Sequence, residues 1–162
     1  MFKRVSTDDD ISEVVKLARS IWIEHYTPIV GIEQVEYMLS NFHSRDVISE
    51  EIGQQKYMYF LIKDNHRTIG YFGIQIKSDV LFLSKLYILS SERGQGIGRI
   101  AMNFIKKLGQ KNHVGIISLT VNRNNKGSIA AYYKMGFVKT GEVCVDIGEG
   151  YKMDDFKMEL ML

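Results

Sequence analysis

The sequence predicts an α/β fold in which a mixed sheet is flanked by helices. Its 162 residues suit one domain, helix-like and strand-like segments alternate, and no repeat or low-complexity linker interrupts them. Patterns typical of helices occupy residues 8–26, 32–42, 47–54, 97–108 and 128–135. Apolar runs typical of strands occupy residues 2–5, 57–62, 68–76, 80–89, 116–121, 137–146 and 151–160. We therefore expect a single domain that covers residues 1–162.

The first predicted helix has the clearest boundaries. Ser6 or Thr7 can cap its N-terminus, and the three aspartates at residues 8–10 match the positive end of the helix dipole. Pro28 disfavours helical backbone in the residue before it, so we expect this helix to end near Tyr26.

Turn-forming residues separate later segments. Asp64-Asn65-His66 lies between two strand-like runs and predicts a hairpin turn. Gly136 follows the helix-like residues 128–135 and predicts a left-handed helix end.

The composition points to a reducing compartment. Cys144 is the one cysteine, which excludes an intrachain disulfide and a cysteine-based zinc site. It lies in a strand-like run, where an inert buried thiol is a better interpretation than an acyl-enzyme nucleophile. The N-terminal residues turn acidic where a signal peptide would be apolar, and no run approaches the ~18 apolar residues of a membrane span. We expect a cytoplasmic protein with no membrane partner.

Charge is divided unevenly along the chain. Residues 93–141 carry nine Lys and Arg and no Asp or Glu, so the rest of the chain carries −7 of a net charge of +2. The basic half suits an anion, either nucleic acid or a phosphorylated cofactor. Basic and aromatic residues do not interleave on a strand as nucleic-acid binding requires, so we expect no nucleic-acid partner.

A glycine-rich stretch, "SSERGQGIGR" at residues 91–100, joins a predicted strand to a predicted helix. Its backbone N–H groups and the helix dipole form an anion cradle, to which Arg93 and Arg99 add donors. It is not a P-loop, because Arg99 follows Gly98 where a lysine is needed. Nor is it a dinucleotide loop, because no acid follows at the distance that would hold a ribose.

Two segments resemble one family. Arg93-Gly94-Gln95-Gly96-Ile97-Gly98 is similar to the Gln/Arg-x-x-Gly-x-Gly/Ala signature of the GNAT family of N-acetyltransferases. Residues 125–137, "NKGSIAAYYKMGF", resemble the family's Asn-x-x-(Ala/Ser)-Ile-x-x-Tyr-x-x-x-Gly-Phe segment. With the order of elements the likeness covers nearly the whole chain. It implies the GNAT fold, a mixed and mostly antiparallel sheet with splayed central strands, flanked by helices.

The resemblance implies acetyl-CoA, or another acyl-CoA, as the donor. In the family the strand before the glycine loop splays from its neighbour and pairs with the pantetheine arm, while the loop holds the pyrophosphate. By this resemblance the cofactor-binding residues are Leu86, Tyr87, Ile88, Arg93, Gly94, Gln95, Gly96, Ile97, Gly98, Arg99 and Asn125. Asn125 also reads as a plain helix N-cap, and both roles are compatible.

The resemblance also implies catalytic roles. Tyr132 matches the tyrosine that protonates the departing CoA sulfur in many members, and its pKa near ~10 suits a thiol leaving group. Tyr133 competes, because neighbours on a helix point about 100° apart and one of them faces the cleft. A backbone N–H, by resemblance that of Ile88, would stabilise the oxyanion. Residues 81–90 contain no carboxylate, so the general base stays open among Glu24, His25, Asp154, Asp155 and a water chain.

The acceptor is expected to be a primary amine. Trp22, Glu24, Tyr26 and Asp154 are the candidate substrate residues, because aromatic faces and carboxylates attract an ammonium group. Together with the acidic balance outside the basic stretch, they favour a small cationic amine such as a polyamine. A small metabolite amine, an aminoglycoside or a protein N-terminus remain open, and these acids and aromatics also read as surface and core.

A different class of function also stays open. The domain could bind acyl-CoA as a sensor without transferring the acyl group, although Tyr132 argues against it. Homodimers are common in the family, and the resemblance leaves a homodimer open here.

Overall fold

The computed structural model describes residues 1–162 and contains a seven-stranded sheet of order β1-β2-β3-β4-β5-β7-β6. The strands are β1 Phe2–Arg4, β2 Met58–Asp64, β3 Arg67–Lys77, β4 Val80–Ile88, β5 Ile116–Asn122, β6 Val138–Gly148 and β7 Tyr151–Met161. The helices are α1 Asp8–Val30, α2 Ile32–Phe42, α3 Arg45–Gly53, α4 Ile97–Lys111 and α5 Lys126–Lys134, with a short 3-10 helix, η1, at Ser90–Glu92. Strand β4 pairs with β5 in parallel, whereas β1–β2, β2–β3, β5–β7 and β6–β7 are antiparallel. The predicted mixed, mostly antiparallel sheet is confirmed.

The chain forms two compact units. The N-terminal unit comprises residues 1–75 and 85–101, and the C-terminal unit comprises residues 76–84 and 102–162. Strands β3 and β4 and helix α4 contribute residues to both. Each unit is described by itself.

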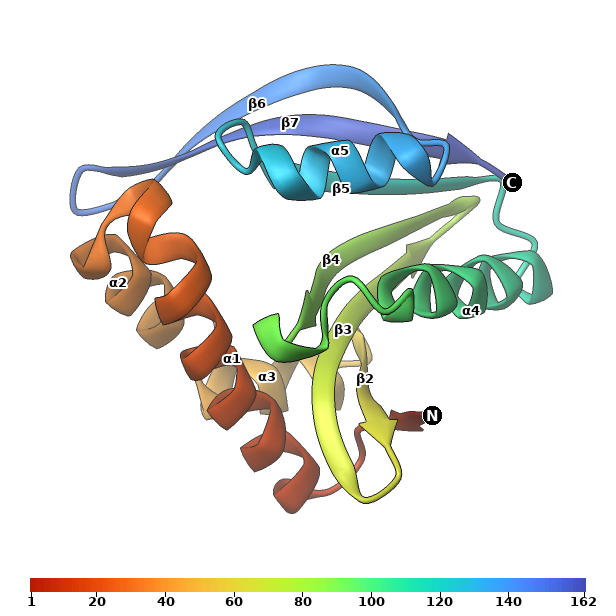
Figure 1. Ribbon diagram of the computed structural model, residues 1–162, viewed down its shortest axis with the longest axis horizontal. Helices are drawn as coiled ribbons and strands as arrows, with labels where there is room; N and C mark the ends of the chain where they lie inside the picture. Colours follow the sequence, from red (N-terminus) through yellow and green to blue (C-terminus); the bar gives the residue numbers. More distant parts are fainter. The chain divides into compact units, whose positions relative to one another are not determined.

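The N-terminal unit packs α1, α2 and α3 on the β1–β2–β3 meander. Helix α2 turns back beside α1 (Figure 1). Buried apolar side chains of α1 recur at helical spacing and meet inward-facing side chains of β2 and β3. The core of this unit includes Val14, Ala18, Ile21, Val35, Leu39, Ile48, Tyr59, Leu61 and Tyr71. This packing holds both long helices against the sheet.

Helix α1 begins as predicted and ends later. Thr7 is the N-cap and forms a capping box with Asp10, whose carboxylate also pairs with Lys3 at 2.6 Å. The expected end near Tyr26 is wrong, because α1 continues through Pro28 to Val30. A proline in the last turn removes a single helical N–H donor, and the turn is still closed by the Gly31 N–H to Thr27 O bond of 3.0 Å.

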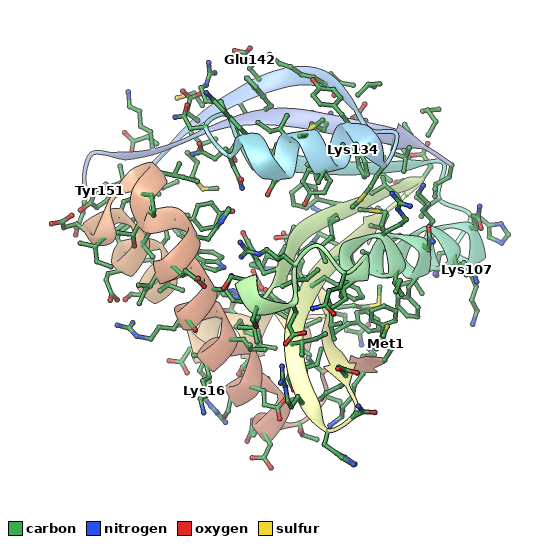
Figure 2. The ribbon with its side chains drawn as sticks, in the orientation of Figure 1. Met1, Lys16, Lys107, Lys134, Glu142 and Tyr151 are labelled. Atoms are coloured by element: carbon green, nitrogen blue, oxygen red, sulfur yellow. The ribbon has the colours of Figure 1, made fainter.

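The C-terminal unit is built on β5, with β7 and β6 beyond it. Its core contains Ile117, Leu119, Val121, Phe137 and Met158. Strands β6 and β7 form a long hairpin (Figure 1), and Figure 2 labels Glu142 on β6 and Tyr151 at the start of β7.

Two local expectations have different outcomes in this unit. Gly136, just after α5, has φ +97°, which confirms the left-handed helix end. Cys144 was expected to be buried, and this is wrong: its side chain is exposed on β6, the last strand of the sheet. None of the helices is both long and apolar enough to cross a membrane.

Candidate functional site

The glycine loop between β4 and α4 has the backbone that an anion cradle needs. Gly94 and Gly96 have φ values of +78° and +80°, a region that side chains with a Cβ rarely adopt. A Cβ placed on either glycine would meet no heavy atom within 4 Å, so the space outside the loop is open. The loop is exposed and leads into the N-terminus of α4 at Ile97. The conformation therefore requires glycine for backbone geometry, and it leaves room for a ligand.

Side chains around the loop are ordered by local bonds. Arg93 Nε donates to the carbonyl oxygen of Ile88 at 3.0 Å, so this arginine folds back onto the end of β4. Glu92, the acid nearest the loop, pairs with Arg67. Arg99 is exposed in the first turn of α4. Because Arg67 offsets the charge of the Glu92 carboxylate, the loop keeps a favourable environment for a negatively charged ligand.

An aromatic cluster joins α1 to β4 within the N-terminal unit. Trp22 is 5% exposed, and its ring centroid lies 5.8 Å from that of Tyr26 and 5.5 Å from that of Tyr87. The hydroxyl oxygens of Tyr26 and Tyr87 are 3.1 Å apart. The predicted acceptor residues Trp22 and Tyr26 therefore pack against Tyr87, a predicted cofactor residue.

Two residues that the sequence did not single out complete this cluster. Trp22 Nε1 donates to the Tyr71 hydroxyl at 3.0 Å, and that hydroxyl lies 3.0 Å from His43 Nε2. The His43 ring stacks on Trp22 with centroids 5.1 Å apart. Burial, and then the charge of Lys85, lower the pKa of His43 well below its usual value. The imidazole is therefore neutral, and its Nδ1 has no hydrogen-bond partner.

Lys85 is the second feature that sequence reasoning missed. It lies on β4 two residues before Tyr87, so both side chains project from the same face of the strand. Its Nζ is 5.3 Å from the ring centroid of Tyr57 and 5.4 Å from that of Tyr59, and the Tyr59 hydroxyl donates to Glu51 at 2.6 Å. Burial lowers the pKa of Lys85, and the Glu51 charge partly opposes this. Strand β4, which contains no carboxylate, therefore carries a buried lysine on the same face as Tyr87.

The two predicted acceptor acids, Glu24 and Asp154, are engaged with other groups, and so is Glu36 on α2. Glu24 accepts a hydrogen bond of 2.8 Å from Ser90 Oγ. Asp154 pairs with Arg123 at 2.7 Å in the C-terminal unit. Glu36, on α2, forms a two-pronged pair with Arg19 at 2.6 and 2.9 Å. Arg123 and Arg19 offset the charges of Asp154 and Glu36, whereas the neutral Ser90 hydroxyl brings no opposite charge to Glu24.

The second sequence motif lies in the C-terminal unit. Asn125 is 4% exposed and caps α5, accepting from the Ser128 N–H at 3.4 Å. Tyr132 is half-buried, with its ring 5.4 Å from that of Phe137, whereas Tyr133 is 50% exposed. The two tyrosines therefore occupy different environments, as their helical spacing predicts.

Strands β4 and β5 part within the same unit. Their paired residues are Val80–Phe82 with Ile116–Ser118, although β5 continues to Asn122. The splayed central strands expected from the resemblance are present.

Asp155, on β7, is the most perturbed carboxyl group of the chain's C-terminal unit. It is 6% exposed, and burial raises its pKa to about 6, while a hydrogen bond from Thr120 lowers it and the charge of Asp154 raises it. No cation pairs with it, because Arg123 is held by Asp154 and by Glu142 at 3.1 Å. A buried carboxylate without a counter-ion is costly, which marks the position as a candidate for function.

Comparison with known proteins identifies the family of this chain. The profile of the Acetyltransferase (GNAT) family matches residues 17–137, which include the glycine loop and the segment around Tyr132. The chain belongs to the GNAT acetyltransferase family. The expectation of a GNAT acetyltransferase with this fold is therefore confirmed.

Individual GNAT relatives are more distant. A spermidine N(1)-acetyltransferase from Thermoplasma acidophilum is 23% identical over 133 residues, 80% of this chain and 83% of that protein. N-acetyltransferase 8 from Mus musculus is 34% identical over 67 residues, 41% of this chain, and the match spans only 30% of its length. The crystal structure of PaiA N-acetyltransferase from Thermoplasma acidophilum in complex with coenzyme A has a TM-score of 0.81 at 20% identity, over 100% of this chain and 99% of that one.

Proposed function

We propose that this GNAT protein transfers the acetyl group of acetyl-CoA directly to a primary amine. The observation that carries the proposal is the glycine loop. Gly94 and Gly96 adopt left-handed backbone at the entrance to α4, with open space in front of them. That arrangement suits the negatively charged pyrophosphate of CoA, because backbone N–H groups and a helix N-terminus both favour an anion.

The donor would run from the loop along β4. The backbone of Leu86, Tyr87 and Ile88 is the proposed partner of the pantetheine arm, and residues 93–99 are the proposed pyrophosphate site. The parting of β4 from β5 supports this, because strands that separate leave main-chain donors and acceptors available to a ligand. Asn125 is the proposed contact from α5.

The chemistry would use few groups. The Ile88 N–H is the proposed donor to the developing oxyanion, and Tyr132 is the proposed acid that protonates the departing thiolate. The half-buried position of Tyr132 supports this role over Tyr133, because a partly buried phenol can be held in one orientation.

For the acceptor, we favour a small cationic amine of the polyamine type. The spermidine N(1)-acetyltransferase relative supports this class, as do the half-buried rings of Tyr26 and Tyr87, because aromatic faces attract an ammonium group. Glu24 would contribute a carboxylate oriented by Ser90, and Asp154 a carboxylate whose charge is offset by Arg123. A protein N-terminus is the alternative acceptor.

The test is release of CoA thiol from acetyl-CoA with spermidine, spermine, lysine, an aminoglycoside and N-terminal peptides. Saturable release with a polyamine would support the proposal. Tyr132→Phe should lower kcat at least tenfold at unchanged CoA affinity, while the matched Tyr133→Phe should keep wild-type kcat. CoA binding without release on any amine would instead favour the sensor function.

A further inference from the structure

The end of the β4–β5 pairing creates an unusual position on β5. After Ser118 the strand has β7 on one side, where pairing continues to Asn122, and no paired β4 residue on the other. Thr120 lies on this stretch. If the proposed function is correct, the acyl group of the donor is held where these strands part, so groups beside Thr120 are candidates for the chemistry.

Asp155 is directed to this stretch by strand register. It is the partner of Asn122 across the antiparallel β5–β7 pair, and residues opposite each other share a face of the sheet. Thr120, two residues from Asn122, also belongs to that face. The hydrogen bond between the Thr120 hydroxyl and the Asp155 carboxylate agrees with the shared face and holds the carboxylate beside Thr120, on the part of β5 that β4 does not pair with.

Burial is the main cause of the raised pKa of Asp155, and the groups around it modify that effect. Its own strand contributes Asp154, which repels a second negative charge, and β5 contributes Thr120. Arg123, the residue after β5, pairs with Asp154. Strand β6 contributes Val143 opposite Asp155 and, beside it, Glu142, which takes part of the charge of Arg123. Asp155 is thus a buried acid stabilised in its charged form by one hydroxyl.

We propose that Asp155 is the general base of the reaction, positioned by Thr120, and that it takes a proton from the acceptor ammonium directly or through one water molecule. This assignment rests on the proposed function. It is distinct from Glu24, which is held by Ser90, and from Asp154, which is held by Arg123.

The proton and electron balance is complete with the groups named. The Asp155 carboxylate accepts one proton from R–NH₃⁺, and the freed lone pair forms a C–N bond to the acetyl carbon. The C–S bond breaks with its electron pair on sulfur, which takes a proton from Tyr132, and the attacking nitrogen loses its extra proton, which restores Tyr132 through solvent. Asp155 then returns its proton to solvent, so one proton is released for each amide formed.

A buried carboxyl group with a pKa of about 6 is suited to this task, because it is ionised at neutral pH and still basic enough to accept a proton. The pH profile of kcat/KM for the amine should therefore show an acid limb near pH 6 in the wild type. The limb should move to higher pH in Thr120→Val, because that change removes a hydrogen bond that lowers the pKa.

The experiment compares the wild type with Asp155→Asn, Thr120→Val and Glu159→Gln. Glu159 is the matched control, because it is a carboxylate on the same face of β7 that is paired with Lys157 at 2.7 Å. We expect Asp155→Asn to lower kcat about 10²–10⁴-fold at pH 7 and to lose the acid limb, with CoA affinity unchanged. Glu159→Gln should keep the wild-type rate and profile.

The outcomes separate the two proposals. A wild type that acetylates amines, with Asp155→Asn active within about threefold and with the same acid limb, overturns the assignment of the base and leaves the proposed function standing. A wild type that binds CoA and acetylates no amine overturns both. If Asp155→Asn is inactive because it misfolds, the direction of the limb shift in Thr120→Val still decides: no shift, or a shift to lower pH, contradicts the inference.

Discussion

The indole nitrogen of Trp22 and the hydroxyl of Tyr71 are joined by a buried hydrogen bond of 3.0 Å. Because the Tyr71 oxygen accepts from Trp22, its own proton is available to Nε2 of His43, 3.0 Å away. The Tyr71 hydroxyl therefore links α1, the end of α2 and β3.

Tyr71→Phe should destabilise the protein by about 2–4 kcal/mol, since it leaves a buried N–H and a buried ring nitrogen without partners. Urea unfolding would measure the loss. Tyr133→Phe, the same chemical change at a 50% exposed side chain, should cost less than about 0.5 kcal/mol. Similar losses in both variants would contradict the role of the Tyr71 hydroxyl.

His43 should make the protein less stable in mild acid. Its pKa is lowered in the folded state, so the unfolded chain binds more protons as the pH falls through the usual histidine value of about 6.5. Folding stability is then fully present above that value and is lost below it. Melting temperatures of the wild type and His43→Gln between pH 5 and 8 would test this, and equal slopes in the two proteins would argue against it.

Asp155 should have the opposite effect on stability. Its folded pKa of about 6 lies above the ordinary aspartate value of 3.8, so between these values the folded protein holds a proton that the unfolded chain has released. Stability therefore falls as the pH rises through this window and stays low above it. Asp155→Asn should be more stable than the wild type at pH 8 by about 1–3 kcal/mol, measured by urea unfolding. A loss of stability at pH 8 would assign Asp155 a structural role instead.

Gly96→Ala should weaken CoA binding more than it weakens the fold. A Cβ at φ +80° is strained by about 1–2 kcal/mol although it meets no neighbour, and relief of the strain turns the loop amides away from the ligand. We expect at least a tenfold rise in the Kd for CoA by calorimetry. Gly127→Ala, a glycine of α5 with open space around it, is the control and should slightly favour the helix.

Lys85→Met should improve the use of polyamines. The Lys85 cation lies on the same face of β4 as Tyr87 and occupies the faces of Tyr57 and Tyr59, so it repels an acceptor ammonium nearby. The KM for spermidine should fall several-fold with the Kd for CoA unchanged. A rise in KM would mean that Lys85 helps to bind the acceptor, as it would for an acceptor that carries a carboxylate.

Local patterns predicted most elements closely. Residues 32–42 were expected to be a helix and α2 has these bounds, while the Asp64-Asn65-His66 turn is present with Asn65 at φ +51°. Two expectations were wrong because they depend on the position of a residue within its element or sheet. Pro28 lies in the last turn of α1, where a proline is tolerated. Cys144 lies on a strand at the edge of the sheet, where its side chain is exposed.

The residues of the candidate site also fall into two groups, those that local sequence patterns predict and those that they do not. The glycine loop and the segment around Tyr132 were recognisable because their chemistry depends on short-range spacing, as backbone conformation and helix periodicity do. His43, Tyr71, Lys85 and Thr120 carried no such signal. Their roles depend on partners distant in the sequence, as in the 49-residue separation of Trp22 and Tyr71.

The sequence by itself determined the family, and it predicted the anion cradle and the choice of Tyr132 over Tyr133 as the acid, because each inference rests on neighbours along the chain. Only the tertiary structure decided which carboxylates are neutralised by cations and which is buried without one. Asp154 and Asp155 are adjacent in sequence and opposite in environment, since successive residues of a strand point to opposite faces. That alternation leaves Asp154 beside Arg123 and turns Asp155 toward Thr120, where burial raises its proton affinity.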